Sequence, residues 1–412
     1  MKFIENSIAG IKQALDNPET KSQELLFKLL LSQFQKIQTA LDDKKKFITY
    51  YTYCGPVEIF NAMDSLVPIC TEPFIILSAA FFGIDMKDFL DAAAGYGIPE
   101  DVCSGHRSPI GMALKGALPT PDLVISTSHT SCSDMKSGVF LKDFYGIPCY
   151  LLDTPYRFDE KGISYYANQL KGMVSFLEDK TGEKMDPARL KESVTLADEA
   201  ISICKEINRL RRKIPTPMKN RDLVGPFLAT FTAAGSQEAV DYLKALRDEI
   251  KKRDAGEEKQ IRLYYAFVMP FFHEAMELFD WLENEHGAKI VMDVFSYWPE
   301  EERLDPDNPF ESLARKEFYR PLIKPLLGEV ERWTEDAVKF TKDYQADGVI
   351  FYTQSGCKIS CSSIRTVSDA IRKRTGKPTL VIDGDVVDST IISVDTIKTK
   401  LEGFFEMLEE RD

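Results

Sequence analysis

The segment DLVISTSHTSCSDM, residues 122–135, places a short apolar run directly before a cysteine and the expected start of a helix. Asp122–Ser128 has the apolar, β-branched composition of a buried strand. Cys132 follows that strand and stands where the next helix is expected to begin. A buried strand that leads into a helix is the repeating unit of a parallel, helix-covered sheet.

The same alternation of apolar strands and helices continues on both sides of this segment. The predicted strands are Phe47–Tyr53, Leu66–Cys70, Asp122–Ser128 and Cys149–Asp153 in the first half, and Arg262–Pro270, Lys289–Ser296, Gly348–Gln354 and Thr379–Asp385 in the second. Such alternation predicts an α/β fold. We therefore expect two Rossmann-like or flavodoxin-like lobes with parallel sheets, joined by a helical middle segment and preceded by N-terminal helices.

This pattern divides the chain into four expected regions. They are N-terminal helices in 1–45, a first α/β lobe in 46–160, a helical connecting region in 161–258 and a second α/β lobe in 259–412. The connecting region has no convincing strand. One of its long helices opens with Asp186 and Pro187, a favourable N-cap and first-turn pair. Pro215 and Pro217 then break the helical pattern.

The charge balance of the 412-residue chain narrows the range of partners. Lys and Arg number 52 against 65 Asp and Glu, so the net charge is −13. Such a chain lacks the excess of cations expected of a dedicated nucleic-acid or anionic-membrane binder. The longest apolar run, Pro73–Ile84, is too short to span a membrane. The opening MKFIENSIAG does not have the pattern of a signal peptide, so we expect a cytoplasmic protein.

Sequence motifs of several common chemistries are missing from the chain. There is no Walker A pattern, no GxGxxG after the first strand, no HExxH and no GxSxG nucleophile elbow. Only four histidines occur, and we expect His273 and His286 to be structural or solvated. The absence of these motifs favours redox or metal chemistry.

The eight cysteines are the main candidates for that chemistry. Cys149 and Cys204 lie in apolar strand and helix patterns, and we expect them to be buried. The other six stand where strand-like or Gly-containing segments end: Cys54, Cys70, Cys103, Cys132, Cys357 and Cys361. A helix N-terminus lowers the pKa of a cysteine placed there, so a cluster of thiolates is plausible at these positions.

Three of these cysteines are expected at the crevice between the lobes, because ligands of open parallel sheets bind beyond the carboxyl ends of the strands. Cys132 and Cys357 each follow a predicted strand, and Cys103 precedes a helical stretch. Three thiolates can hold a four-iron cluster and leave one iron open to substrate. The alternative is three unrelated loop cysteines.

Longer segments around these cysteines resemble a known family. CSGHRSPIGMALKGALPTPDLVISTSHTSCSDMKSGVF, GIPCYLLDTPYR and, near the end, ADGVIFYTQSGCKIS are similar to the 2-hydroxyacyl-CoA dehydratase / benzoyl-CoA reductase family. The resemblance covers nearly the whole chain beyond the first helices. Its most specific part is the cysteine spacing, 29 residues from Cys103 to Cys132 and 225 from Cys132 to Cys357.

The resemblance implies an iron–sulfur subunit of an anaerobic (R)-2-hydroxyacyl-CoA dehydratase. Its [4Fe-4S] cluster would be bound by Cys103, Cys132 and Cys357. It would pair with a homologous second subunit or with itself, and receive single electrons from an ATP-dependent iron–sulfur activator protein. The acyl-CoA substrate would lose water through a ketyl radical to give a 2-enoyl-CoA. A subunit of the benzoyl-CoA reductase type, which reduces an aromatic acyl-CoA, is the alternative in the same family.

The resemblance also names candidate catalytic residues. In TYCGPVEIF, Pro56 and Glu58 match a Pro-x-Glu motif of the family, so Glu58 is a candidate acid/base or substrate-positioning carboxylate. Its other interpretation is a Glu favoured at a helix N-terminus. Thr52 could supply a hydroxyl near the substrate. Arg107 and Lys136 could offset the charge of thiolates and CoA phosphates, or could be solvated surface residues.

Cys54, Cys70 and Cys361 exceed the three ligands of a single cubane. Members of this family with a double-cubane [8Fe-9S] cluster use additional cysteines and reduce small molecules. These three residues are therefore possible additional ligands, and a double-cubane reductase stays open. A non-catalytic member that only holds a cluster or stabilises a partner is the third possibility.

Overall fold

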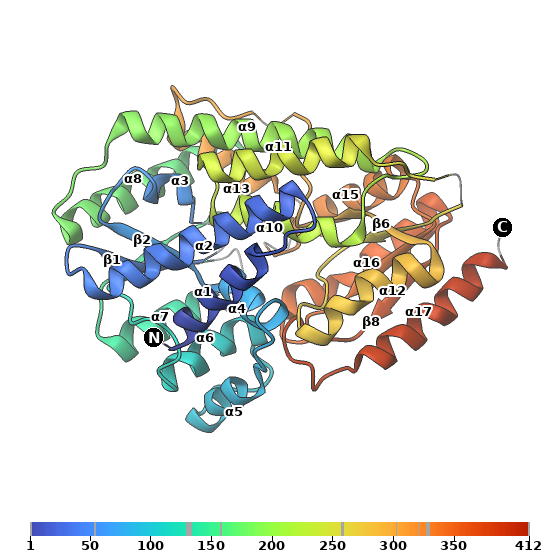
Figure 1. Cartoon of the computed structure of the whole chain (residues 1–412), viewed down its shortest axis with the longest axis horizontal. Coiled ribbons are helices and arrows are strands. Elements are labelled where there is room, and N and C mark those ends of the chain that lie inside the picture. The colour runs from blue at the N-terminus through green and yellow to red at the C-terminus, as the bar shows by residue number, and fades with distance from the viewer. Residues whose placement is uncertain are drawn as a thin grey trace.

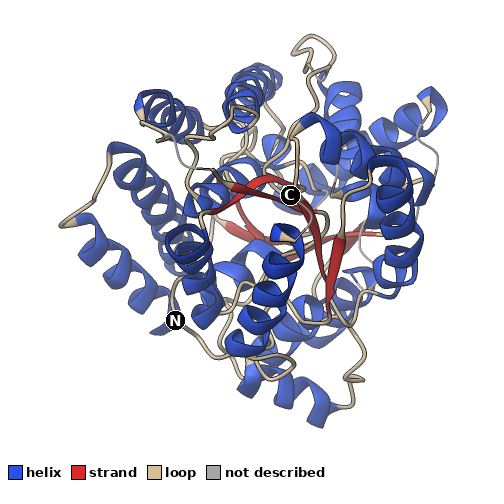
Figure 2. Cartoon of the chain, turned by 90° about the vertical axis from the view of Figure 1, so that its right-hand side faces the viewer, coloured by secondary structure: helices blue, strands red, loops and turns tan. Residues whose placement is uncertain are grey.

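The computed structural model describes residues 2–52, 55–128, 134–156, 159–256, 259–301, 303–320, 322–326 and 330–410. Within these ranges the chain forms two parallel four-stranded sheets surrounded by helices (Figure 2). The fold is therefore of the α/β class with two lobes, as the alternation of strands and helices predicts.

The first sheet contains β1 (Phe47–Tyr51), β2 (Leu66–Cys70), β3 (Leu123–Thr127) and β4 (Cys149–Leu152), in the order β2-β1-β3-β4. The second contains β5 (Ile261–Tyr265), β6 (Ala288–Asp293), β7 (Gly348–Tyr352) and β8 (Thr379–Ile382), in the order β6-β5-β7-β8. Both orders are the same when the strands of each lobe are counted from its first. All pairings are parallel, and the central strands β3 and β7 are buried along their whole length.

Helices cover both sheets and fill the middle of the chain. The N-terminal pair is α1 (Lys2–Leu15) and α2 (Lys21–Asp42). The first lobe adds α3 (Val57–Phe60), α4 (Thr71–Ala80), α5 (Lys87–Tyr96), α6 (Ser104–Leu114) and α7 (Asp134–Tyr145). The middle consists of α8 (Glu160–Thr181), α9 (Pro187–Arg211), η1 (Asn220–Leu223), α10 (Val224–Thr232) and α11 (Gln237–Lys252). The second lobe adds η2 (His273–Met276), α12 (Glu277–His286), α13 (Pro309–Tyr319), α14 (Ile323–Leu326), α15 (Val330–Asp343), α16 (Lys358–Thr375) and α17 (Val394–Glu409).

The helical middle connects the two lobes. Helix α9 begins as expected, because the Asp186 side chain accepts hydrogen bonds from the N–H groups of Ala188 and Arg189. It spans both lobes along one side of the molecule (Figure 1) and contacts α3 of the first and β6 of the second. Helix α13 packs against α8. Its approach to α8 is supported by an ion pair between Lys171 and Glu311 at 3.5 Å.

Several sequence-based expectations need correction. The predicted strand Arg262–Pro270 ends at Tyr265, because the chain leaves the regular parallel pairing there. Val268 keeps only an isolated antiparallel bridge to Tyr352, and Phe267 and Val268 line a cavity with Cys103 of the first lobe. Cys149 is only half-buried, because β4 is an edge strand, whereas Cys204 is buried as expected. The helix after Cys357 starts directly at Lys358.

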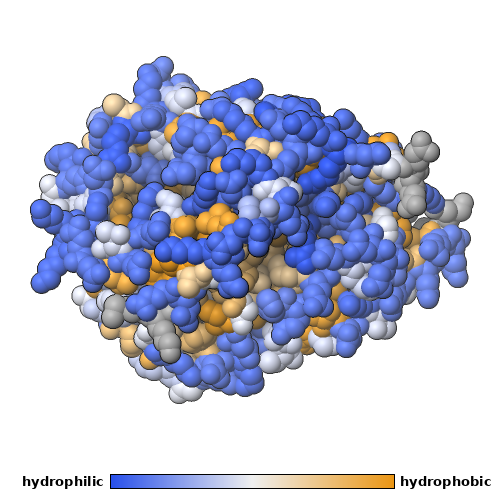
Figure 3. Space-filling view, viewed as in Figure 1, coloured by the Kyte–Doolittle hydropathy of each residue, from blue (hydrophilic) through white to orange (hydrophobic). Residues whose placement is uncertain are grey.

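The face of the molecule in Figure 3 is predominantly hydrophilic, with hydrophobic side chains visible between polar ones. Among the described residues, no helix combines the length and the apolar character needed to cross a membrane.

Candidate functional site

The strand order places a topological switch point in each lobe. In the first lobe the chain leaves β1 for β2 on one side and later pairs β3 on the other side. The carboxyl edge between β1 and β3 is the place where parallel sheets of this order bind ligands. Thr52, directly after β1, is buried there, and its Oγ1 lies 3.2 Å from Oγ1 of Thr127 at the end of β3.

The structure brings Cys103 and Cys357 to one cavity of about 80 Å³ between the lobes. Both residues are N-caps, Cys103 of α6 and Cys357 of α16. Backbone N–H groups at a helix N-terminus stabilise a thiolate. Most of the other lining residues are apolar and come from both lobes: Ile75, Ile76, Phe267, Val268, Phe295, Leu322, Val386 and Val387. Three polar side chains, Glu72, His106 and Gln354, also line the cavity.

A close backbone contact holds these two cysteines near each other. A Cβ atom built on Gly356 would lie 2.4 Å from both Cα and N of Cys103, so only glycine fits without a shift of the backbone. Gly356 directly precedes Cys357. The backbone N–H of Cys357 donates to the carbonyl of Gln354 over 2.7 Å, and Sγ of Cys361 lies 3.1 Å from the same carbonyl.

Two residues of this cavity were not singled out from the sequence. Glu72 and His106 are both buried and line the cavity, with Nδ1 of His106 3.9 Å from Oε1 of Glu72. Sγ of Cys70 lies 3.9 Å from the other oxygen of Glu72. The signal was present in the spacing, because Glu72 follows Cys70 by two residues and His106 follows Cys103 by three. Cys70 itself is buried at the end of β2.

The other predicted site residues have different surroundings. Glu58 is fully buried in α3, and both of its carboxylate oxygens accept hydrogen bonds from Nζ of Lys316, at 2.7 and 2.8 Å. Glu58 and Thr52 are not among the residues that line the cavity of Cys103 and Cys357 in the described part of the chain. Arg107 is buried and donates from Nε to the carbonyl of Val102, whereas Lys136 is exposed.

Comparison with known proteins identifies the family of this chain. Residues 52–408 match the family model described as 2-hydroxyglutaryl-CoA dehydratase, D-component. The chain belongs to this dehydratase family. The matched residues include the helical middle and both lobes apart from β1, and they also leave out α1 and α2.

Relatives of the chain within this dehydratase family include enzymes of two reaction types. A benzoyl-CoA reductase subunit of Thauera aromatica is 27% identical over 76% of this chain and 78% of its own length. The (R)-phenyllactyl-CoA dehydratase alpha subunit of Clostridium sporogenes is 23% identical over 78% of this chain and 80% of its own. The beta subunit of the same enzyme is 22% identical over 79% of this chain and 86% of its own. The chain is thus similar to both subunits of one dehydratase.

The thiols of Cys103 and Cys357 suit the iron–sulfur chemistry that the cysteine pattern of this dehydratase family implies. Sulfur donors are the ligands that iron–sulfur clusters use, and these two meet in one cavity from separate lobes. Among the described residues, no set of three or more His, Cys, Asp or Glu side chains is placed to hold a metal ion. Cys132 and Cys54, a predicted ligand and a possible additional one, lie outside the described residues.

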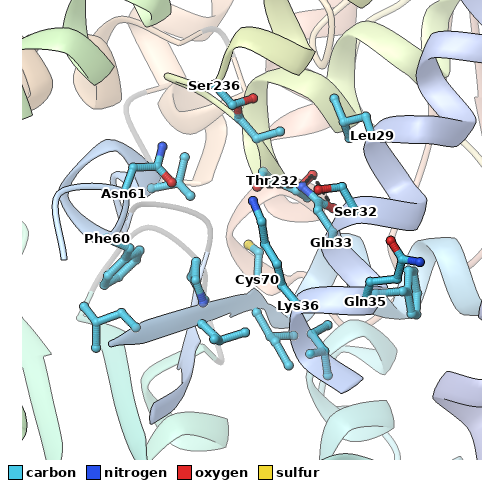
Figure 4. A pocket seen from close by; sticks show the side chains of 18 of the residues that line it. Leu29, Ser32, Gln33, Gln35, Lys36, Phe60, Asn61, Cys70, Thr232 and Ser236 are labelled. Atoms are coloured by element: carbon cyan, nitrogen blue, oxygen red, sulfur yellow. Dashed lines mark hydrogen bonds between the residues drawn. The ribbon is translucent and has the colours of Figure 1, made fainter. Parts of the chain in front are cut away.

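A second cavity, of about 630 Å³, lies between α2 and the edge strand β2 (Figure 4). Its lining mixes apolar residues of β2 with polar side chains such as Gln33 and Asn61, and it includes Cys70. Cys103 and Cys357 do not line it. The two cavities lie against different residues of α4. Phe74 and Leu77 line the second cavity, and Ile75 and Ile76 line the cavity of Cys103 and Cys357.

Proposed function

We propose that this chain is the iron–sulfur subunit of an anaerobic (R)-2-hydroxyacyl-CoA dehydratase. A [4Fe-4S] cluster would be held by Cys103, Cys132 and Cys357. The observation that carries the proposal is the meeting of Cys103 and Cys357, 254 positions apart in a chain of this family, in one cavity between the lobes. In the sequence Cys132 comes after β3 and Cys357 after β7, and these two strands have equivalent positions in the two sheets.

The proposed reaction removes the 2-hydroxyl and a 3-hydrogen of a 2-hydroxyacyl-CoA as water and gives a 2-enoyl-CoA. No net oxidation occurs, because the electron that starts the reaction is returned at its end. When bound, the cluster would supply single electrons and one open iron as a Lewis acid. The chain would hold the cluster at two helix N-termini and keep water away with the apolar walls of the cavity.

Thr52 and Glu58 have supporting roles in the proposal. Thr52 directly follows β1 at the switch point of the first lobe, and we propose that its hydroxyl binds a substrate carbonyl or hydroxyl. Glu58 would be a positioning carboxylate, because its bonds to Lys316 tie α3, the helix after β1, to α13. Nζ of Lys316 occupies both carboxylate oxygens of Glu58, which supports positioning over proton donation.

The proposed partners follow from the relatives. Since this chain is similar to both the alpha and beta subunits of one dehydratase, we propose pairing with a homologous subunit or with a second copy. An ATP-dependent iron–sulfur activator protein would deliver the electron. The proposed location is the cytoplasm.

A reductase of the benzoyl-CoA type is the second candidate. One observation favours it: the benzoyl-CoA reductase subunit of Thauera aromatica is 27% identical to this chain, whereas the phenyllactyl-CoA dehydratase subunits are 22–23% identical. A double-cubane [8Fe-9S] reductase is a variant of this candidate. Cys361 supports it, because it contacts the same loop as Cys357, and Cys70 supports it through its contact with Glu72.

The test is iron and acid-labile sulfide per chain after strictly anaerobic purification, with the electron paramagnetic resonance spectrum of the reduced protein. About four irons support the single cubane, and about eight support the double-cubane reductase. A folded chain without iron contradicts every cluster-based proposal and leaves the scaffold role.

Single substitutions identify the ligands. Cys103→Ser, Cys132→Ser and Cys357→Ser should each lower the iron content, and Cys149→Ser in the half-buried edge strand is the matched control. A Cys132→Ser protein with its full iron content would contradict the ligand assignment. Turnover of a 2-hydroxyacyl-CoA or of an aromatic acyl-CoA, with a defined activator, then separates dehydratase from reductase.

A further inference from the structure

The two lobes are joined beside Cys103 and Cys357 by three buried polar side chains. Ser104, the first residue of α6, hydrogen-bonds to Oδ1 of Asp385 in the loop after β8. Nε2 of Gln354, in the loop after β7, donates to Oδ2 of Asp385 over 2.7 Å and to Oγ of Ser104 over 3.2 Å. The exposed fractions of these residues are 0% for Ser104 and 3% for Gln354 and Asp385.

The same three residues are firmly held by their own backbone surroundings. Oδ1 of Asp385 accepts the N–H groups of Val387 and Asp388, each over 3.0 Å. Oε1 of Gln354 accepts the N–H of Val386 over 2.7 Å. These bonds use both ends of the Gln354 amide and both oxygens of Asp385. A buried polar network with its hydrogen bonds made is rigid and fixes one arrangement of the parts it joins.

Ser104 and Gln354 are each close in sequence to one of the two cysteines. Ser104 follows Cys103 directly, and the Gln354 carbonyl accepts the N–H of Cys357. The Gly356–Cys103 contact lies between them. A small shift of one lobe along the other would therefore move one cysteine relative to the other.

We propose that Ser104, Gln354 and Asp385 are positioning residues that fix the separation of the Cys103 and Cys357 thiols. This inference rests on the proposed function only for the identity of the group that the thiols bind. Gln354 also lines the cavity of the two cysteines, but the proposed role of the network requires no contact with the substrate or the cluster. The network acts through the backbone of the two cysteines, as residues around metal ligands commonly do.

The decisive variants are Gln354→Leu, which removes three hydrogen bonds at nearly constant volume, and Asp385→Asn, which keeps the shape of the side chain. The matched control is Asn220→Ala. Asn220 is equally buried and bridges Phe279, Ala288 and Ile290, so it ties the second lobe at the first residue of β6 and does not contact the cysteine loops.

In the iron-loaded protein, both variants should lose iron to a chelator at least tenfold faster than the unchanged chain, in the range seen when support of metal ligands is removed. Their electron paramagnetic resonance signals should also broaden. Asn220→Ala should lower the thermal midpoint but leave the rate of iron loss and the signal unchanged. Unchanged iron retention in a folded Asp385→Asn protein, or an equal effect of Asn220→Ala, would overturn the proposal.

A second readout needs no iron. In the cluster-free chain, a short bifunctional thiol reagent should link Cys103 to Cys357, with the linked pair identified by peptide mass spectrometry. Gln354→Leu and Asp385→Asn should lower the yield of this link at least severalfold, and Asn220→Ala should not. If the chain never binds iron, the proposed function fails while this yield still decides the positioning role. An unchanged yield in both variants contradicts it.

Discussion

Gly356 packs against the backbone of Cys103 so closely that a methyl group at position 356 would lie 2.4 Å from Cα of Cys103. The two residues belong to different lobes, so this contact sets how near the loop after β7 comes to the start of α6. Backbone atoms on both sides of a contact cannot move aside as the end of a flexible side chain can.

Gly356→Ala should therefore separate the two lobes locally. We expect a loss of about 1–3 kcal/mol in the free energy of unfolding, as for other overpacked sites, and a lower iron content in the loaded protein. Urea denaturation and iron analysis measure the two effects. Gly403→Ala is the control, because no atom lies within 4 Å of a Cβ at this helical position. Alanine there should stabilise by about 0.5–1 kcal/mol.

The Glu58–Lys316 pair should show an asymmetric response to substitution. Lys316→Met leaves Glu58 as a buried carboxylate without its cation, which typically costs about 3–5 kcal/mol. Glu58→Gln should cost less, because Lys316 keeps Glu317 at 3.1 Å. The double variant should recover part of the loss. Denaturant unfolding of all four proteins measures the coupling, and additive losses would contradict it.

Arg320 should not tolerate lysine. Its guanidinium lies 4.2 Å from the ring centre of Phe231 and 4.7 Å from that of Trp298, and it is almost fully buried. A planar cation stacks between two rings, and an ammonium group does not, so Arg320→Lys should cost about 1–2 kcal/mol. Arg332 is the control, because its guanidinium lies 5.8 Å from the ring centre of Tyr319. Arg332→Lys should change the thermal midpoint much less than Arg320→Lys.

The Cys204 thiol should be inert in the folded chain. Burial raises the pKa of this thiol from its ordinary value of 9.0 to about 12. At pH 8.5 iodoacetamide should label half-buried Cys149 but not Cys204, and unfolding in urea should make both react. Peptide mass spectrometry distinguishes the two sites, and rapid labelling of Cys204 before unfolding would contradict the prediction.

The raised pKa of Cys204 also has a consequence for stability. Between pH 9 and about 12 the folded state binds this proton more tightly than the unfolded state, so stability falls as the pH rises through this window. The contribution is fully present below pH 9. Cys204→Ala should therefore reduce the alkaline loss of the free energy of unfolding, measured by urea titrations at several pH values.

Much of the fold could be predicted from local patterns. Leu66–Cys70 is a strand with the predicted ends, and the predicted N-terminal helices are present. The predicted ends of strands were less accurate where the apolar residues next to a strand line a cavity and do not extend the strand. Phe267 and Val268 extend the apolar run after β5, but they line the cavity between the lobes. The periodicity of apolar residues indicates that a residue is buried, but it does not indicate which part of the protein that residue packs against.

The site could be predicted only in part. The place of Cys357 at a helix N-terminus follows from the strand–loop–helix pattern, and that of Cys103 from the helical stretch that it precedes. Both patterns are local in the chain. Their meeting with Glu72 and His106 depends on how the lobes pack. The environment of Glu58 could not be predicted from the sequence for the same reason, because Lys316, the cation that pairs with it, lies 258 positions away.

The sequence by itself determined the α/β class, the two parallel sheets and the cysteines that follow strands, because each depends on the periodicity and turn chemistry of a few neighbouring residues. The tertiary structure alone decided which side chains share a cavity and which charges are paired. Those outcomes depend on contacts such as Gly356 with Cys103 and Ser104 with Asp385, where residues hundreds of positions apart exclude water together.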